Sequence, residues 1–440
     1  MISQNKPLTS LNVLSFSGIQ MRTFHITWVT FFVCFFGWFG LAPLMPAIRA
    51  DLGLTKPQVG NTIIAAVSAT IFARLIIGRL CDTWGPRKTY TALLVVGSLP
   101  VMLVGLAHDY TSFLLFRLAI GIIGASFVIT QYHTSAMFAP NIKGTANAVA
   151  GGWGNLGGGV TQLIMPLIMT TIVGFGYVKG DAWRLAMIVP GVLMLVMAYV
   201  YYTYTKDTPA GNFQSAGPDG IEQTSSAKSG ISFWKACADI RVWGLALAYA
   251  GCFGMEITFD GVAALYFFDN FHVSMTEAGF WAMLFGFMNL FARALGGILA
   301  DRVGRTYGMR GKGWLLGGLL LLEGVGVILF AQSGNLPIAI ASMLSFALFL
   351  KMANGSTYAI VPFVNPKAVG VISGVVGAGG NLGGMLMGFL FKSETITYAQ
   401  AFGYIGIAVA SVGALLFLIN FNEKTQVADE LELVPIAERA

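Results

Sequence analysis

Apolar residues form long stretches of this chain, and short polar segments separate them. Each stretch is about twenty residues long, which is the length that an α-helix needs to cross a bilayer. Runs of about ten alternating polar and apolar residues, typical of membrane β-barrels, do not occur. We therefore predict an all-α membrane protein with twelve transmembrane helices, at 26–48, 58–80, 89–107, 112–138, 144–171, 184–205, 241–268, 277–300, 313–332, 335–360, 368–391 and 398–421.

Composition and charge refine this picture. Of the 440 residues, 56% are hydrophobic and 10% are charged, which leaves too little polar surface for a soluble globule. The polar first 24 residues do not lead into a short apolar core with a small-residue cleavage site, so we expect the first helix to be retained. An even number of helices places both termini on one side of the membrane.

The basic residues predict which side that is. Sixteen Lys and Arg fall in the segments on the side of the termini, and five fall on the opposite side. The positive-inside rule then places both termini in the cytoplasm, with the protein in the cell membrane. The net charge of +6 reflects this topology, so we expect a lipid bilayer and no nucleic acid as a partner.

A long hydrophilic segment divides the predicted helices six to six. Residues 206–240 are rich in Gly, Ser, Pro and charge, as domain linkers are. We expect an N-terminal six-helix bundle at 1–205, a cytoplasmic linker at 206–240, and a C-terminal bundle with a short cytoplasmic tail at 241–440.

Two arginines, Arg74 and Arg293, lie inside apolar stretches, and the sequence around one repeats around the other 219 positions later. The residues that follow keep the same spacing: Gly78, Asp82 and Gly85 after the first, and Gly297, Asp301 and Gly304 after the second. A guanidinium stays charged and costs at least about 2.5–3.5 kcal/mol at the bilayer centre, so it needs an anionic partner. One such residue in each half predicts an anion site between two related bundles.

A glycine-rich block around Asn155 also repeats, around Asn381, 226 positions later. Its glycines include 151, 154, 157 and 158 in the first copy and 377, 380, 383 and 384 in the second. Spacings of three and four residues line one helix face, which close helix packing alone explains. The asparagines favour more than packing, because a buried carboxamide must find a backbone group or a bound oxyanion. Two repeats in one order imply duplicated bundles with a transport site near the midplane.

Other chemistry is not indicated. Glycines at 152, 154 and 157 match a dinucleotide-binding spacing, but that motif joins a strand to a helix and these lie inside an apolar span. The histidines show no metal-ligand spacing, and no nucleophile, base and orienting group stand out. We expect no enzyme activity, metal or cofactor.

Charged residues inside the seventh predicted helix raise a second question. Glu256 and Asp260 lie one turn apart and must be protonated, paired or exposed to water. Lys351 and Arg117 are the available buried cations. A static ion pair and a carboxylate that carries a coupling proton both fit. The cytoplasmic aspartates of the arginine blocks, Asp82 and Asp301, are either topology anchors or, as we favour, conformational latches.

These motifs resemble those of a known family. The block at 78–88, its second copy and Arg117-Leu118-Ala119-Ile120-Gly121 resemble general motifs of the major facilitator superfamily. The segments 151–163 and 377–384 are similar to the paired signatures of its nitrate/nitrite porter family. The resemblance covers nearly the whole chain and implies a transporter with two pseudo-symmetric six-helix bundles.

The resemblance implies roles that periodicity alone does not give, since the pattern by itself marks the aromatic residues as core. Arg74 and Arg293 would clamp the anion, because a planar fork of donors matches a flat, trigonal nitrate. The remaining implied substrate contacts are a sandwich of Phe127 and Tyr358, a hydrogen bond from Tyr249, and the signature residues Gly154, Asn155, Gly380 and Asn381. Many members have Phe in place of Tyr358, a change that preserves stacking.

The coupling mode also follows from the resemblance. The segment 254–260, with Glu256 and Asp260, and Arg117 resemble the branch that uses protons, whereas the exchanging branch lacks the acidic pair. We predict a monomeric nitrate importer that works by alternating access and proton symport, with nitrite as a possible further substrate. The alternatives are nitrate/nitrite exchange, a porter for another small anion such as a carboxylate, and a membrane sensor that binds nitrate without transporting it.

Overall fold

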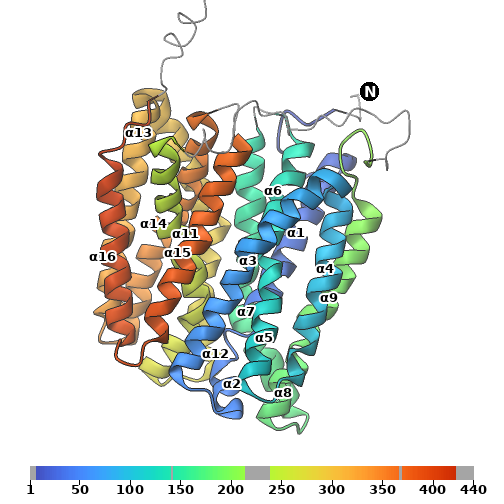
Figure 1. Cartoon of the computed structure of the whole chain (residues 1–440), viewed down its shortest axis with the longest axis vertical. Coiled ribbons are helices and arrows are strands. Elements are labelled where there is room, and N and C mark those ends of the chain that lie inside the picture. The colour runs from blue at the N-terminus through green and yellow to red at the C-terminus, as the bar shows by residue number, and fades with distance from the viewer. Residues whose placement is uncertain (1–5, 140–141, 214–237, 366–368, 423–440) are drawn as a thin grey trace, which may run out of the picture.

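The computed structural model describes residues 6–139, 142–213, 238–365 and 369–422, and helices make up most of them (Figure 1). The first half contains α1 (Gly18–Phe39), α2 (Met45–Leu52), α3 (Lys56–Trp84), α4 (Pro86–Leu103), α5 (Tyr110–Ile120), α6 (Ser126–Met137), α7 (Lys143–Gly174), α8 (Lys179–Ala186) and α9 (Ile188–Tyr204). The second half contains α11 (Ile240–Phe271), α12 (Met275–Phe287), α13 (Ala292–Ala331), α14 (Leu336–Val364), α15 (Val369–Lys392) and α16 (Tyr398–Leu416). Short 3-10 turns at Val104–Leu106, Gly121–Ala125 and Met288–Leu290 extend or join these helices.

Eleven helical segments in the described ranges are long and apolar enough to cross a membrane, and they cover the twelve predicted helices. The eighth and ninth predicted helices fall in one segment, Met275–Ala331, because α13 continues through Gly308. At Gly308 the backbone adopts φ 62° and ψ −157°, and the Lys312 ammonium lies 2.8 Å from the Asp301 carboxylate. Residues eleven apart in a straight helix are separated by about 16 Å, so the chain reverses direction at Gly308.

The first helix differs from its predicted bounds. It begins at Gly18 rather than at 26 and ends at Phe39, and the residues predicted as its last turns form the separate short helix α2. Polar side chains at its start favoured a later boundary. In the fold Gln20, Thr23 and His25 are buried, and the Gln20 amide donates to the Lys6 carbonyl at 2.7 Å.

Side-chain caps fix the helix starts at the end of the bundle opposite the N-terminus. Thr55, Ser274 and Thr397 each accept from the backbone N–H three residues on, and the side chain at that third position returns a hydrogen bond. Asp109 caps α5 in the same way. These reciprocal bonds satisfy N–H groups that a helix start leaves without partners. The predicted linker at 206–240 lies mostly outside the described residues, since 214–237 are not described.

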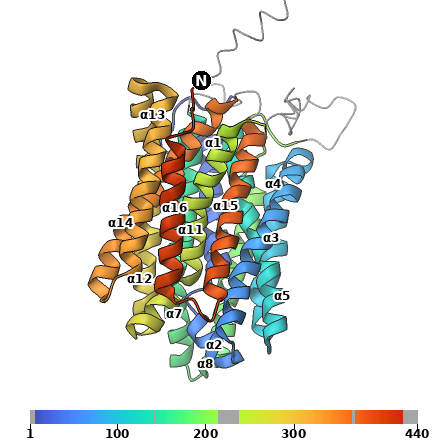
Figure 2. The same ribbon diagram turned by 60° about the vertical axis from the view of Figure 1, so that its left-hand side comes forward.

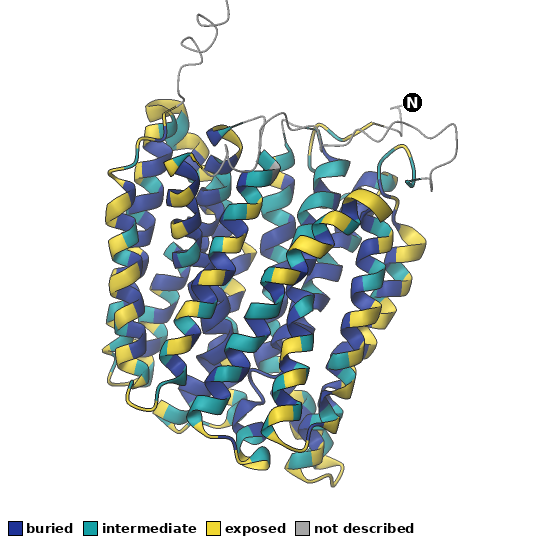
Figure 3. Ribbon diagram, viewed as in Figure 1, coloured by how far each residue is buried: buried dark blue, intermediate teal, exposed yellow. Residues whose placement is uncertain are grey.

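The helices pack as two groups that lie side by side in both views (Figures 1 and 2). Within the first group α1 contacts α7 and α4 contacts α9, and within the second α13 contacts α14 and α16. Between the groups, α3 packs on α15 and α7 packs on α12. The two contacts correspond to each other, because α3 and the α12–α13 segment carry the repeated arginine blocks and α7 and α15 carry the repeated glycine blocks. Buried residues face the interior and exposed ones the outside (Figure 3).

Candidate functional site

The two membrane arginines project from different halves into one interior region. Arg74 lies on α3, and its Nη1 donates to the Gly377 carbonyl of α15 at 3.0 Å. Arg293 lies in the first turn of α13, and its Nη2 donates to the Tyr249 hydroxyl at 3.1 Å. Nε and Nη2 of Arg74 and Nη1 of Arg293 are buried without a protein hydrogen-bond partner. Among the described residues, no carboxylate forms a salt bridge with either guanidinium.

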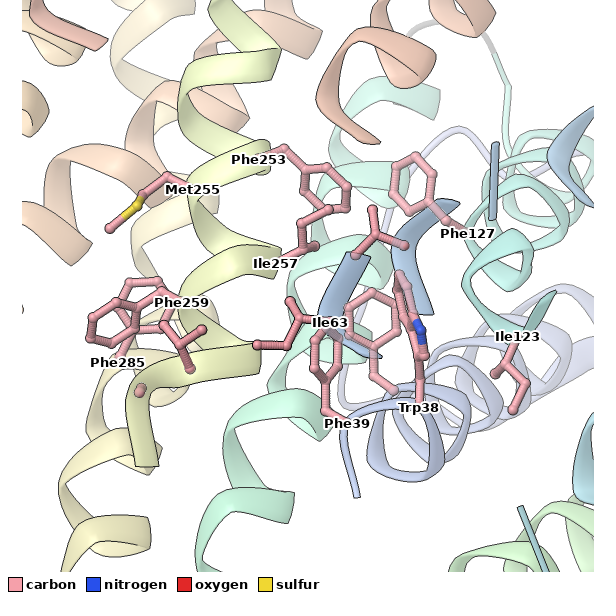
Figure 4. Packing of buried hydrophobic residues seen from close by; sticks show 14 of the residues in the cluster. Trp38, Phe39, Ile63, Ile123, Phe127, Phe253, Met255, Ile257, Phe259 and Phe285 are labelled. Atoms are coloured by element: carbon pink, nitrogen blue, oxygen red, sulfur yellow. The ribbon is translucent and has the colours of Figure 1, made fainter. Parts of the chain in front are cut away.

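Four aromatic residues connect the two guanidinium groups. The Arg74 guanidinium lies 5.4 Å from the ring centre of Phe127 and 5.9 Å from that of Phe253. Tyr249 and Tyr358 each interact electrostatically with both arginines, and their rings meet edge to face at 5.1 Å. Phe127 and Phe253 point toward one another from the two halves (Figure 4). The arginines therefore share one cluster of π-systems, which attract cations and can stack on a planar anion.

The rings implied to sandwich the anion are not parallel in this conformation. Phe127 and Tyr358 have centroids 6.2 Å apart and meet at 64°. Tyr249 and Phe253 are stacked at 4.9 Å with an interplanar angle of 3°, which leaves no room between them. A sandwich of Phe127 and Tyr358 would require one ring to rotate, and it stays a prediction for the occupied site.

The glycine blocks let helices and side chains approach one another closely. A Cβ on Gly154 would lie 1.9 Å from Phe31, and one on Gly380 would lie 2.6 Å from Tyr249 and 2.8 Å from Phe253. Gly377 faces the Arg74 guanidinium in the same way, at 3.3 Å. The packing explanation therefore accounts for these glycines, and two of them also position site residues. Direct substrate contact by Gly154 and Gly380 stays a prediction.

The paired asparagines have different partners. Asn381 donates to the Gly377 carbonyl at 3.3 Å, the same oxygen that accepts from Arg74. Asn155 donates across the two halves to Glu256 at 3.2 Å. Their side-chain carbonyl oxygens are both buried without a protein partner. One signature thus supports the arginine clamp, and the other contacts the buried acidic site.

Glu256 lies in a dense set of donors. Its carboxylate is 2.7 Å from the Lys351 ammonium, and both side chains are fully buried. Besides Asn155, it accepts from Asn289 at 3.0 Å and from Asn354 at 2.6 Å. Such a set holds a carboxylate in its ionised form, because removing a buried ion from water is offset only by good partners. This geometry is that of the static ion pair weighed above.

Asp260 lies one turn further along α11, and its side chain has different surroundings from that of Glu256. It is 2% exposed, and neither carboxylate oxygen has a protein hydrogen-bond partner. A Cβ on Gly158 of the first half would lie 3.3 Å from its Oδ2. The neighbouring Gln162 donates to the Asp260 backbone carbonyl at 2.7 Å, not to the side chain. An unpaired carboxyl at this depth is the arrangement expected of a protonated group.

The remaining predicted residues lie outside this centre. Arg117 is buried, and its Nε donates to the Thr62 carbonyl within its own half at 3.3 Å. Asp301 pairs with Lys312 beyond the Gly308 reversal, and Asp82 is exposed and interacts with Tyr132. These partners lie within the same half as each aspartate. The latch role of Asp82 and Asp301 stays a prediction.

Contacts between the halves are found at the end opposite the N-terminus. Arg49 of α2 binds both oxygens of Asp269 at the end of α11, at 2.7 and 2.9 Å, and Tyr398 donates to the same carboxylate. Lys56 donates to the Ile396 carbonyl, and Gly60 packs directly on the Lys392 backbone. The Asp269 hydrogen bond raises the pKa of Arg49 above its ordinary value, so this pair does not lose its positive partner at physiological pH.

Three residues that contact the arginines or Glu256 were missed by the sequence interpretation. Phe253 stands one turn after Tyr249, and Asn354 lies three residues after Lys351 on one helix face. Both spacings were visible, but aromatic and amide residues are too common to mark a site alone. Asn289 lies in a 3-10 turn, where the 3.6-residue period of an α-helix does not apply.

Comparison with known proteins places this architecture in a class. Residues 27–388 match the model of the Major Facilitator Superfamily. A bacterial homologue of the human lysosomal transporter Spinster, solved in an inward-facing and unoccupied conformation, superimposes with a TM-score of 0.65 at 16% identity, over 91% of this chain and 95% of that one. The chain is therefore a multi-pass membrane transporter of the major facilitator fold and not an enzyme.

Curated relatives narrow the class. The chain is 37% identical to the high affinity nitrate transporter 2.5 of Arabidopsis thaliana, over 96% of this chain and 84% of the relative. It is 38% identical to the high-affinity nitrate transporter 2.3 of Oryza sativa subsp. japonica, over 94% and 80%. The nitrate/nitrite transporter NrtP of a Picosynechococcus strain is 29% identical, over 84% of each. The chain belongs to the nitrate/nitrite porter family of the major facilitator superfamily.

Proposed function

We propose that this protein imports nitrate across the cytoplasmic membrane by alternating access, with protons as the coupling ion. The observation that carries the proposal is the pair of buried guanidinium groups, one from each half. They share one aromatic cluster, retain free donors, and have no carboxylate partner among the described residues. A bound anion supplies the missing charge and accepts the free N–H groups.

The shape of the donors favours nitrate. Arg74 and Arg293 are planar forks, and nitrate is flat with three equivalent oxygens, so each fork can meet one edge of the anion. The Tyr249 hydroxyl accepts from Arg293 and also hydrogen-bonds with the Tyr358 hydroxyl, so both phenols lie beside the guanidinium donors. The names of the relatives support the same substrate, and nitrite has a related planar geometry.

The contacts between halves support a rocking cycle. The halves are joined by Arg49 and Asp269 at the end opposite the N-terminus. With both termini in the cytoplasm, this is the outer end, and the conformation is closed to the outside. Opening outward would break the Arg49–Asp269 pair and move α3 against α15 and α7 against α12. The division into bundles at 1–205 and 241–440, joined at 206–240, and a monomeric working unit belong to this proposal.

Energetics favour symport over unaided import. An anion entering a negative interior costs roughly 2.3 kcal/mol per 100 mV, so at least two protons per nitrate are needed for the voltage to assist entry. Asp260, without a side-chain partner, is the carboxyl that binds one of them. Glu256 stays ionised beside Lys351 and orients the centre.

The test is uptake of labelled nitrate into proteoliposomes with an imposed pH gradient, with and without internal nitrite. We expect wild-type uptake to rise as the outside is acidified, because protons fill Asp260 from that side. Asp260→Asn should flatten this dependence while keeping nitrate-for-nitrate exchange. Uptake that ignores the pH gradient and requires internal nitrite would instead establish exchange. Better displacement of label by formate or oxalate than by nitrate would establish a carboxylate porter.

A further inference from the structure

A third acidic side chain lies in the second half, in a position that the proposed mechanism has not used. Glu323 is in the middle of the part of α13 that follows Gly308, and its side chain is fully buried. Neither of its carboxylate oxygens has a protein hydrogen-bond partner. A buried polar group without a partner is rare and requires an explanation.

The neighbours of Glu323 connect it to the central ion pair. The titratable groups that interact with it are Lys351 of α14 and Glu256 and Cys252 of α11. On the side of α16, the adjacent Gly324 packs on Gly406 and Ala410, which carry no charge. Lys351 is the cation among these neighbours, and its ammonium already forms an ion pair with the Glu256 carboxylate at 2.7 Å.

One ammonium cannot compensate two carboxylates in a medium of low dielectric. The cost of an unpaired buried ion is several kcal/mol, so Lys351, while it is paired with Glu256, cannot by itself keep a second carboxyl group ionised. The charge state of Glu323 therefore depends on the remaining charges of the centre. It can ionise only when the positive charge of the surrounding centre is no longer compensated by another anion.

We propose that Glu323 is a proton-binding site of the transport cycle, which takes up a proton when nitrate binds and releases it when nitrate leaves. Nitrate adds a negative charge beside Arg74 and Arg293, and this charge favours the neutral form of nearby carboxyl groups. When nitrate departs, the positive charges of Arg74 and Arg293 are no longer compensated, and this excess positive charge favours the ionised form of Glu323. Coupling of this kind is reciprocal, so protonation also strengthens nitrate binding.

Charge counting supports the assignment. Among the residues that the structure describes, the cations of the centre are Arg74, Arg293 and Lys351, and its carboxyl groups are Glu256, Asp260 and Glu323. With all three carboxyl groups ionised, the empty centre is neutral. With nitrate bound and protons on Asp260 and Glu323, the centre carries one net positive charge. The negative interior then draws the loaded form inward, as import of an anion requires.

This inference rests on proton symport, and its test separates the two. Purified Glu323→Gln would be reconstituted beside wild type and Glu394→Gln, a control at an exposed position. Counterflow of labelled nitrate at equal concentrations needs no net proton movement and should stay within about twofold of wild type. The proton-to-nitrate ratio, measured from accumulation at clamped potential and pH gradient, should fall from about two to about one, and net uptake should lose its voltage dependence.

Each other outcome has one meaning. A Glu323→Gln protein that keeps the wild-type ratio overturns the role of Glu323 and leaves symport intact. A wild-type protein that moves no protons with nitrate overturns the proposed function itself. If Glu323→Gln lacks counterflow, wild-type protein is treated with dicyclohexylcarbodiimide, which modifies protonated carboxyl groups in apolar surroundings. Mass spectrometry should then find Glu323 modified, and more so with nitrate present. An unmodified Glu323 would refute the proposal.

Discussion

Replacing Arg293 with lysine tests whether the shape of the cation matters as well as its charge. The substitution keeps the positive charge beside Glu256 but removes the planar fork. One guanidinium nitrogen now donates to Tyr249 at 3.1 Å, and Nη1 remains free for the anion. The lysine ammonium, which is a single nitrogen, cannot keep both the hydrogen bond to Tyr249 and the one to the anion. Loss of one hydrogen bond to a charged group costs about 1.5–3 kcal/mol, so the Kd for nitrate should rise about tenfold to more than a hundredfold.

The assay is nitrate binding to purified protein by calorimetry, together with counterflow in proteoliposomes. Arg305→Lys, an exposed change on the same helix, is the matched control and should leave the Kd unchanged. Expression and thermal stability of Arg293→Lys should stay close to wild type, because no carboxylate loses an ion-pair partner. A Kd within about twofold of wild type would refute the reasoning. A twofold change corresponds to a binding free energy of only about 0.4 kcal/mol, which is less than the loss of one charged hydrogen bond.

Two further changes test the packing of the centre. Lys351→Met leaves the buried Glu256 carboxylate without its cation and should destabilise the protein by about 3–5 kcal/mol, seen as a lower Tm. Adding Glu256→Gln should restore much of the lost stability. A Tm that Lys351→Met leaves unchanged would contradict a strong ion pair. Gly154→Ala places a Cβ 1.9 Å from Phe31 and should lower Tm and uptake, whereas Gly144→Ala, with nothing within 4 Å, should be tolerated. Equal effects of the two alanines would remove the packing argument.

Much of the fold could be predicted because its signals are local. Apolar length predicted the membrane helices, and repeat spacing predicted that Arg74 and Arg293 occupy equivalent helices. The helix bounds were less predictable at α1, where buried polar side chains resemble the end of a membrane span. The reversal between the eighth and ninth helices occurs at Gly308, whereas its counterpart in the first half occurs at Gly85, so the repeat does not extend to the connecting turns.

The site was less predictable because its chemistry depends on partners from distant segments. Asn155 and Asn381 stand in nearly identical blocks, yet one donates to Glu256 and the other to the Gly377 carbonyl. Nothing in either block encodes this difference, since the deciding carboxylate lies on α11. The asymmetry has a mechanistic consequence. In the proposed mechanism the proton-binding carboxyl groups lie in the second half, and Asn155 is a contact through which the first half meets Glu256. Among the described carboxylates of the centre, Glu256 is the one with a cationic partner. A rocking motion that separates Asn155 from Glu256 would remove one hydrogen-bond donor from this carboxylate. The relative position of the two halves would thereby influence the charge of the site.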